Sequence, residues 1–145
     1  AQESGGEGKV YKSQMHGQQG ARSAQSLWNR AFIKDFCWDA RAQSLEEQAL
    51  SPLFSPQEMG NNPSQLISSL QAIDAYPKLF KQAFPTTEDL SLEQIATALA
   101  AFQSSLISLN SRYDQYAHGY AEALNQQEIE GLNIFRSFVA RCSQC

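Results

Sequence analysis

The sequence lacks an excess of basic residues and lacks any long apolar run. Its 11 Lys and Arg are outnumbered by 15 Asp and Glu, which gives a formal net charge of −4 and a pI near 5.1. Nucleic-acid-binding proteins normally present a basic face, so we expect no nucleic-acid partner. No apolar run approaches the roughly 20 residues that span a bilayer. No secretory leader precedes Ala1, but a mature or truncated start would lack one too, so this absence excludes nothing.

Strand patterns and internal repeats are also missing. With 145 residues and 42% hydrophobic content, the chain is long enough for one globular core and is not of disordered composition. Residues 1–26 are rich in Gly, Ser and Gln and predict a long loop, and residues 26–36 predict irregular apolar structure. The remainder predicts helices that begin at capping residues, namely Ser44, Ser55, Asn62, Ser91 and Asn125. Pro52 is expected to stop the first of these helices.

Apolar residues repeat at helical spacing along the predicted helices and mark the faces that we expect to be buried. In the longest helix these residues are Leu92, Ile95, Ala96, Leu99, Phe102, Leu106 and Leu109. A short helix through Tyr113 ends near Gly119. In the last helix the inward residues are Ile129, Leu132, Phe135, Phe138 and Val139. The sequence therefore predicts an all-α fold with long loops.

Cysteine is scarce, and two of the 3 cysteines stand together. Cys142 and Cys145 form Cys-Ser-Gln-Cys at the end of the chain, after an amphipathic helix. Thioredoxin-like redox chemistry would need a βαβ context, and structural zinc would need a second ligand pair. Two readings stay open from spacing alone: attachment of a c-type haem, if histidine follows, or a disulfide.

Four other residues have a plain interpretation and a functional one. His16 lies in a loop in which Gly17 and Gly20 allow backbone conformations closed to other residues. It is either an exposed loop side chain or a metal ligand that can move away from the metal. Glu58 is a capping glutamate or a general acid–base. Trp38 packs in a core or serves a site. Gln48, on the same short stretch, could orient a substrate by hydrogen bonding.

Several motifs resemble the bacterial di-haem cytochrome c peroxidases and their MauG-like relatives. They are WDAR from Trp38, LEEQAL from Leu45, P-x-E-M-G from Pro56 and GLNIF from Gly131. The family usually has WDGR, so Ala40 departs from it. The resemblance implies an all-α, cytochrome c-like di-haem peroxidase fold. Residues 1–124 would be the remainder of the N-terminal, peroxidatic haem domain, and residues 125–145 the start of the C-terminal, electron-transfer haem domain.

The resemblance also implies roles for single residues. Cys142 and Cys145 would attach a haem covalently, with the haem-binding histidine directly after them, so the chain would lie between two such histidines. Gly5 and Gly6 match a pair that follows the first one. Glu58 and Gln48 would be the catalytic residues of the distal pocket, Trp38 would lie on the electron path between the haems, and His16 would be the distal iron ligand of the resting state.

Cofactors and partners follow from the same resemblance. We expect two c-type haems, hydrogen peroxide as substrate, and a cytochrome, cupredoxin or quinol as electron donor. A homo-oligomer in the periplasm is expected, with any membrane anchor outside this segment. The family commonly reads Arg-Asn-x-Pro where this chain has Arg22-Ser23-Ala24-Gln25. Serine is a poorer calcium ligand than an amide carbonyl, so this difference disfavours calcium.

Two alternatives to a di-haem peroxidase remain. A MauG-like enzyme would oxidise side chains of a partner protein, although such enzymes generally lack the ligand that His16 resembles. A haem-free helical interaction module would have a disulfide between Cys142 and Cys145. Bound haem would exclude the module, and the two enzymes differ in what they oxidise.

Overall fold

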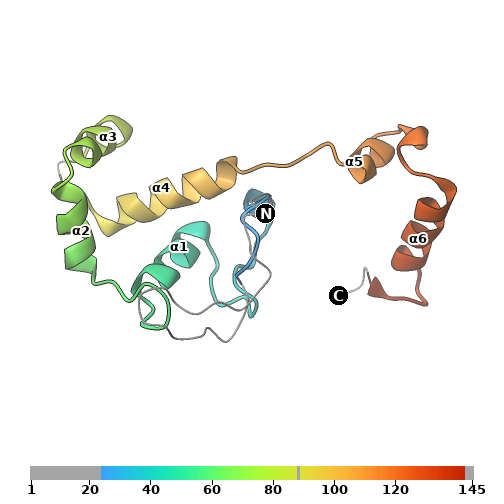
Figure 1. Ribbon diagram of the computed structural model, residues 1–145, viewed down its shortest axis with the longest axis horizontal. Coiled ribbons are helices and arrows are strands. Elements are labelled where there is room, and N and C mark those ends of the chain that lie inside the picture. The colour runs from blue at the N-terminus through green and yellow to red at the C-terminus, as the bar shows by residue number, and fades with distance from the viewer. Residues whose placement is uncertain (1–23, 88, 143–145) are drawn as a thin grey trace. The chain divides into compact units, whose positions relative to one another are not determined.

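The computed structural model describes residues 24–87 and 89–142. Within them the chain forms six α-helices and two short 3₁₀-helices, with one isolated β-bridge between Phe36 and Ala42 (Figure 1). The prediction of an all-α fold is therefore confirmed. The chain divides into two compact units, one ending at Ile107 and one beginning at Ser108. The predicted boundary between haem domains after residue 124 stays a prediction.

Helix α1 (Leu45–Phe54) begins where the sequence predicts, at Ser44. The Ser44 hydroxyl accepts a hydrogen bond from the amide of Glu47 at 3.1 Å. The Glu47 carboxylate accepts from the amide of Gln43 at 2.9 Å, one residue earlier than in a standard capping box. Two donors at the start of the helix are thereby satisfied, which fixes α1 at the end that precedes Gln48.

The prediction that Pro52 stops α1 is wrong, because the helix continues for two residues beyond it. Proline near the end of a helix removes one amide donor, and the last turn still closes with the Ser55 amide donating to the Ser51 carbonyl at 3.0 Å. The helix ends at Ser55 because that residue precedes Pro56. A residue before proline is disfavoured in the helical region, and Ser55 is extended with φ −61° and ψ 123°.

Helix α2 (Pro63–Gln71) confirms the helix predicted from Asn62, and helix α3 (Ala75–Ala83) follows it. The Asn62 side chain accepts from the second helical amide of α2 at 2.9 Å, and Pro63 occupies the first helical position, where its missing donor costs nothing. Helix α3 ends two residues before Pro85, as the restriction on residues preceding proline requires.

Helix α4 (Leu92–Ser105) is the longest helix of the described residues, and its main packing partner is α1 (Figure 1). Its predicted capping box is confirmed: the Ser91 hydroxyl accepts from the amide of Gln94 at 3.3 Å, and the Gln94 side chain accepts from the amide of Ser91 at 3.2 Å. The helix ends at Ser105, so Leu106 and Leu109 lie beyond the face on which they were predicted. None of the described helices is long and apolar enough to cross a bilayer.

The predicted inner face of α4 is only partly correct. Ile95 and Ala96 are buried as expected, but Phe102 is 60% exposed. Ala100 and Gln103 are buried in its stead. Small side chains allow two helices to approach closely, so the face that contacts α1 follows the alanines and not the larger residues. The core of this unit is correspondingly small, and its central cluster is Phe36, Ala42, Leu45 and Ala100.

The second unit contains α5 (Arg112–Ala117), η2 (Ala121–Ala123) and α6 (Gln126–Arg136). The predicted short helix before Gly119 is confirmed, and so is the last helix capped by Asn125. Gly119 has φ 100°, a conformation that glycine adopts without steric cost, and it ends the turn after α5.

The predicted inner face of α6 needs the same correction as that of α4. Ile129 and Leu132 are half-buried, but Phe135 is 53% exposed. Phe138 and Val139 are exposed as well and lie beyond the end of the helix. The inward side of α6 is therefore limited to its first two turns within this chain.

Candidate functional site

Trp38 lies in a short loop that the β-bridge closes. The Phe36 amide donates to the Ala42 carbonyl at 3.0 Å, and the Ala42 amide donates back at 3.4 Å. The Trp38 side chain is 63% exposed, so the alternative of core packing is wrong for this chain. A large aromatic ring left exposed on a structured loop is typical of a surface that contacts something else.

The loop also explains the departure from WDGR. Ala40 has φ 55°, in the left-handed region that costs a residue with a side chain roughly 1–2 kcal/mol and costs glycine nothing. Cys37, at the other end of the same turn, has φ 65°. The glycine of the family motif therefore fits the backbone conformation that this turn adopts, and alanine is tolerated there at a steric cost.

Arg41 connects this loop with the turn that carries Glu58. Its guanidinium donates to the Asp39 carboxylate at 2.9 Å and forms an exposed ion pair with it. The pKa of Arg41 is raised first by that hydrogen bond, then by the electrostatic influence of Cys37 and Asp39, and to a smaller extent by Glu58. Glu58 is therefore within electrostatic range of the Trp38 loop.

Glu58 lies in a turn, and the helix predicted from Ser55 does not form. The amides of Glu58 and Gly60 both donate to the Ser55 carbonyl, at 3.0 and 2.8 Å. The Met59 amide donates to the Pro52 carbonyl at 3.1 Å, so the turn is anchored to the last turn of α1. The Glu58 side chain is exposed. Fixed backbone and accessible carboxylate are what a proton-transfer group needs.

Gln48 lies on α1, one turn before Pro52, and is half-buried. Its Oε1 atom is buried and has no hydrogen-bond partner among the described residues. A buried carbonyl oxygen without a donor costs about 1–3 kcal/mol, so such an atom calls for an explanation. The Oε1 atom of Gln103 on α4 is buried without a partner in the same way.

The remaining predicted site residues are described only in part. Cys142 is an exposed free thiol whose sulfur contacts the Ala140 carbonyl at 3.5 Å. It belongs to the second unit, whereas Trp38 belongs to the first, so the electron path stays a prediction. His16 and Cys145 lie outside the described residues. In residues 24–87 and 89–142 no group of three His, Cys, Asp or Glu side chains could hold a metal ion.

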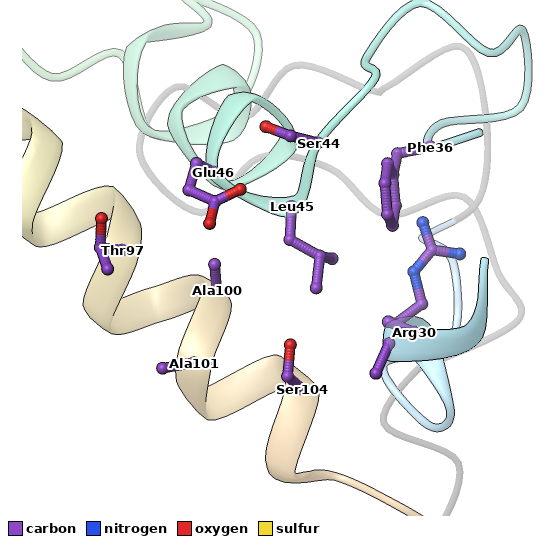
Figure 2. Close-up of a pocket in the computed structure, with 10 residues that line it drawn as sticks. Arg30, Phe36, Ser44, Leu45, Glu46, Thr97, Ala100, Ala101 and Ser104 are labelled. Atoms are coloured by element: carbon purple, nitrogen blue, oxygen red, sulfur yellow. The ribbon is translucent and has the colours of Figure 1, made fainter. Parts of the chain in front are cut away.

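Sequence reasoning missed Arg30, the first residue of η1 (Arg30–Phe32). It is only 6% exposed, and its guanidinium lies over the Phe36 ring at 5.1 Å from the centroid. Arg30 lines a groove of about 340 Å³ between η1, α1 and α4 (Figure 2). Trp38, Gln48 and Glu58 do not line this groove. Segment 26–36 also contains Lys34 and Asp35, so the sequence alone does not single out Arg30.

The described residues fit a protein that binds a large apolar cofactor. Exposed apolar side chains in the first unit include Phe32, Trp38 and Met59, and the buried, unpaired oxygen of Gln48 lies on α1 in the same unit. In the second unit, Phe138 and Val139 are exposed shortly before the Cys142 thiol. Haem needs apolar contacts, and c-type attachment needs cysteine thiols.

Comparison with known proteins identifies the family. Residues 1–122 match the family model described as di-haem cytochrome c peroxidase. The chain is 34% identical over 128 residues to the cytochrome c551 peroxidase of Nitrosomonas europaea, covering 88% of this chain and 37% of that protein. It is 33% identical over 140 residues to the methylamine utilization protein MauG of Methylophilus methylotrophus, covering 96% and 42%. The chain belongs to the di-haem cytochrome c peroxidase family.

Solved structures agree with this assignment. A MauG-like protein associated with microbial copper homeostasis superimposes with a TM-score of 0.84 at 31% identity, covering 96% of this chain and 41% of that one. The diheme peroxidase BthA of Burkholderia thailandensis superimposes with a TM-score of 0.70 at 23% identity, covering 90% and 36%, which shows the fold. The predicted cytochrome c-like fold is confirmed. The chain spans about two fifths of the length of the curated relatives it matches.

Proposed function

We propose that this protein is a haem-dependent peroxidase that reduces hydrogen peroxide to water. Each peroxide takes up two electrons and two protons and leaves as two water molecules. Haem, when bound, supplies the redox-active iron at which the O–O bond breaks. Membership in the di-haem cytochrome c peroxidase family supports this proposal, and the remaining steps concern the residues of this chain.

The observation that carries the proposal is the buried, unpartnered Oε1 of Gln48. Hydrogen peroxide has two O–H donors, and one of them can donate to this oxygen. The bond would satisfy the amide and hold the peroxide in one orientation. Because α1 is capped at Ser44 and packed on α4, the acceptor is held in place before the substrate arrives, which is the preorganisation that catalysis requires.

Glu58 would move the proton. Cleavage of peroxide to water requires a group that takes a proton from one oxygen and returns it to the other, which a positioned carboxylate can do. The turn that carries Glu58 is fixed to the Pro52 carbonyl, and Arg41 lies within electrostatic range of the carboxylate.

The other predicted site residues complete the proposal. Cys142 and Cys145 would attach one of two c-type haems through their sulfur atoms. Trp38, exposed on its loop, would lie on the path of electrons between the haems. His16 would occupy the iron in the resting state and leave before peroxide binds. The proposed donors are a cytochrome, a cupredoxin or a quinol, and the proposed setting is a homo-oligomer in the periplasm.

A MauG-like activity is the second candidate. It is favoured by the likeness to a MauG-like structure at a TM-score of 0.84 and by the 33% identity to a MauG protein. In that case the electrons would come from side chains of a partner protein. The exposed Trp38 would then lie on the path of electrons from that partner. The haem-free helical module is disfavoured by the family assignment.

One experiment on the full-length protein separates the three candidates. Haem absorbance is measured first, and its absence would leave only the haem-free module. The holoprotein is then given hydrogen peroxide with a reduced small cytochrome. Two cytochromes oxidised per peroxide consumed supports the peroxidase. Peroxide consumption that leaves a reduced cytochrome, a reduced cupredoxin and a quinol all unoxidised contradicts the peroxidase, and mass spectrometry of an added partner protein then tests the MauG-like candidate.

A further inference from the structure

Arg30 is a buried cation with few partners. Its guanidinium carries five donors, yet one hydrogen bond is made with the described residues, from Nη2 to the Gln25 side-chain oxygen at 3.1 Å. The Phe36 ring covers one face of it. Among the described residues no carboxylate forms an ion pair with Arg30. The positive charge is therefore held in a buried position without a negative counterpart there.

The position of Arg30 is fixed by the backbone around it. Asn29, which precedes η1, has φ 60°, and its amide donates to the Leu106 carbonyl beyond the end of α4 at 2.9 Å. Phe36 is fixed in turn by the β-bridge to Ala42. The guanidinium is thus held between two anchored segments, so little side-chain freedom remains to be lost when it binds a partner.

The groove beside Arg30 has an apolar floor and polar side chains at its sides. Leu45 of α1 and Ala100 of α4 give it an apolar floor, and Ser104 contributes a hydroxyl near the Arg30 side (Figure 2). Glu46 lines the groove from α1, nearer to Thr97 than to Arg30 (Figure 2). A volume of about 340 Å³ is at the lower end of the range for ligand pockets.

A buried guanidinium is stable only when its charge is compensated. Carboxylate is the natural counterpart, because its two oxygens match the guanidinium fork. The apolar floor suits a ligand whose carboxylate is borne on hydrocarbon, and Glu46 at the other side repels a second negative charge. These features together select a monocarboxylate with an apolar body over an inorganic dianion.

We propose that Arg30 binds a carboxylate borne on an apolar body, which lies in the groove between η1, α1 and α4. Two sources have this chemistry. One is a propionate of a haem bound by the holoprotein, and the other is a small aliphatic carboxylate from solution. The first source depends on the haem binding of the proposed function, whereas the second does not.

The solution source is tested with sodium butyrate and with butyramide, which has the same hydrocarbon body and no charge. Isothermal titration calorimetry of the full-length holoprotein should show binding of butyrate and not of butyramide. Arg30→Met should weaken butyrate binding roughly tenfold or more, as expected for loss of a charge-assisted pair, and Arg30→Lys should weaken it less. Lys34→Met, which removes an exposed cation from the same segment, is the matched control and should change nothing.

The haem source predicts a different pattern. Butyrate then fails to bind, because the propionate holds the site. Arg30→Met lowers the haem reduction potential, since a nearby cation favours uptake of an electron. It also raises the pH at which the potential titrates, because the guanidinium lowers the pKa of a carboxylate beside it. Lys34→Met leaves both readouts close to wild type.

The two proposals fail separately. Haem content, measured first by pyridine haemochrome, tests the proposed function, and without haem the butyrate titration alone decides the inference. The inference is overturned if butyrate and butyramide bind equally. It is overturned as well if butyrate fails to bind and Arg30→Met leaves the potential and its pH profile unchanged. Should Arg30→Met not fold, the two wild-type titrations and Arg30→Lys provide the same test.

Discussion

Arg112 of α5 and Glu128 of α6 form a bidentate ion pair. Nη1 and Nη2 of the arginine donate to the two carboxylate oxygens, each at 2.5 Å, and its Nε donates to the Ala123 carbonyl at 2.9 Å. One of the carboxylate oxygens also accepts from the Asn125 amide at 2.8 Å and so closes the capping box of α6. Glu128 therefore joins the start of the helix that leads toward Cys142 to the helix before it.

This pair makes the stability of the second unit depend on pH. The pKa of Glu128 lies below its ordinary value, first because of the Arg112 hydrogen bond and then because of the Asn125 amide. A carboxyl with a depressed folded pKa contributes stability above its unfolded pKa and loses it as pH falls through the folded pKa. Glu128→Gln should therefore lower Tm at neutral pH, and its difference from wild type should vanish on acidification. The control is Glu122→Gln, and a pH-independent difference would contradict the argument.

Ala40→Gly should stabilise the protein. Ala40 is in the left-handed region at φ 55°, and relief of its strain outweighs the added flexibility of the unfolded chain, by roughly 0.5–1 kcal/mol. The contrasting variant is Ala42→Gly, at a buried position in the β-bridge, which should destabilise. Urea unfolding of the full-length variants measures both effects. Destabilisation by Ala40→Gly would show that the turn does not hold this conformation.

Gln48→Leu should separate stability from activity. Leucine removes the buried unpaired oxygen, so the free energy of unfolding should stay the same or rise by about 1 kcal/mol. Peroxide turnover should fall about tenfold, because the substrate loses the acceptor that orients it. Gln65→Leu, at an exposed position of α2, is the matched control. Loss of stability together with unchanged turnover would assign Gln48 a structural role.

The capping residues made the helix starts predictable. Ser44, Asn62, Ser91 and Asn125 each precede a helix, because a side-chain oxygen at that position satisfies a free amide whatever the rest of the fold does. The end of α1 was misjudged because two prolines compete for it. The decisive one is Pro56, which acts on the residue before it.

Burial was less predictable than secondary structure. Periodicity placed Phe102 and Phe135 in the core, where both are more than half exposed. Helical spacing shows which residues share a face and not what covers that face. For the same reason the buried Arg30 was missed, because its burial comes from Phe36 and α4, which are distant from it in the sequence.

The sequence names the residues of the candidate site, and that assignment stays a prediction, but it does not indicate the contacts that support them. The position of Trp38 on an exposed loop follows from the Phe36–Ala42 bridge, which two hydrogen bonds form. No local sequence pattern predicts this bridge. The Glu58 turn is fixed to α1 by a hydrogen bond from the Met59 amide to the Pro52 carbonyl. These residues are seven positions apart, a separation that helical hydrogen bonding does not produce.

Steady-state peroxide turnover of the full-length Glu58→Gln variant tests directly whether Glu58 transfers the proton. Glutamine keeps the size of the side chain and cannot take up and return a proton. Turnover should fall by a factor of about 10²–10⁴ with haem content unchanged, the range expected for removal of a general acid–base. Glu93→Gln, an exposed glutamate at the start of α4, should turn over peroxide like wild type. Wild-type turnover by Glu58→Gln would contradict the assignment of Glu58 as the proton-transfer group.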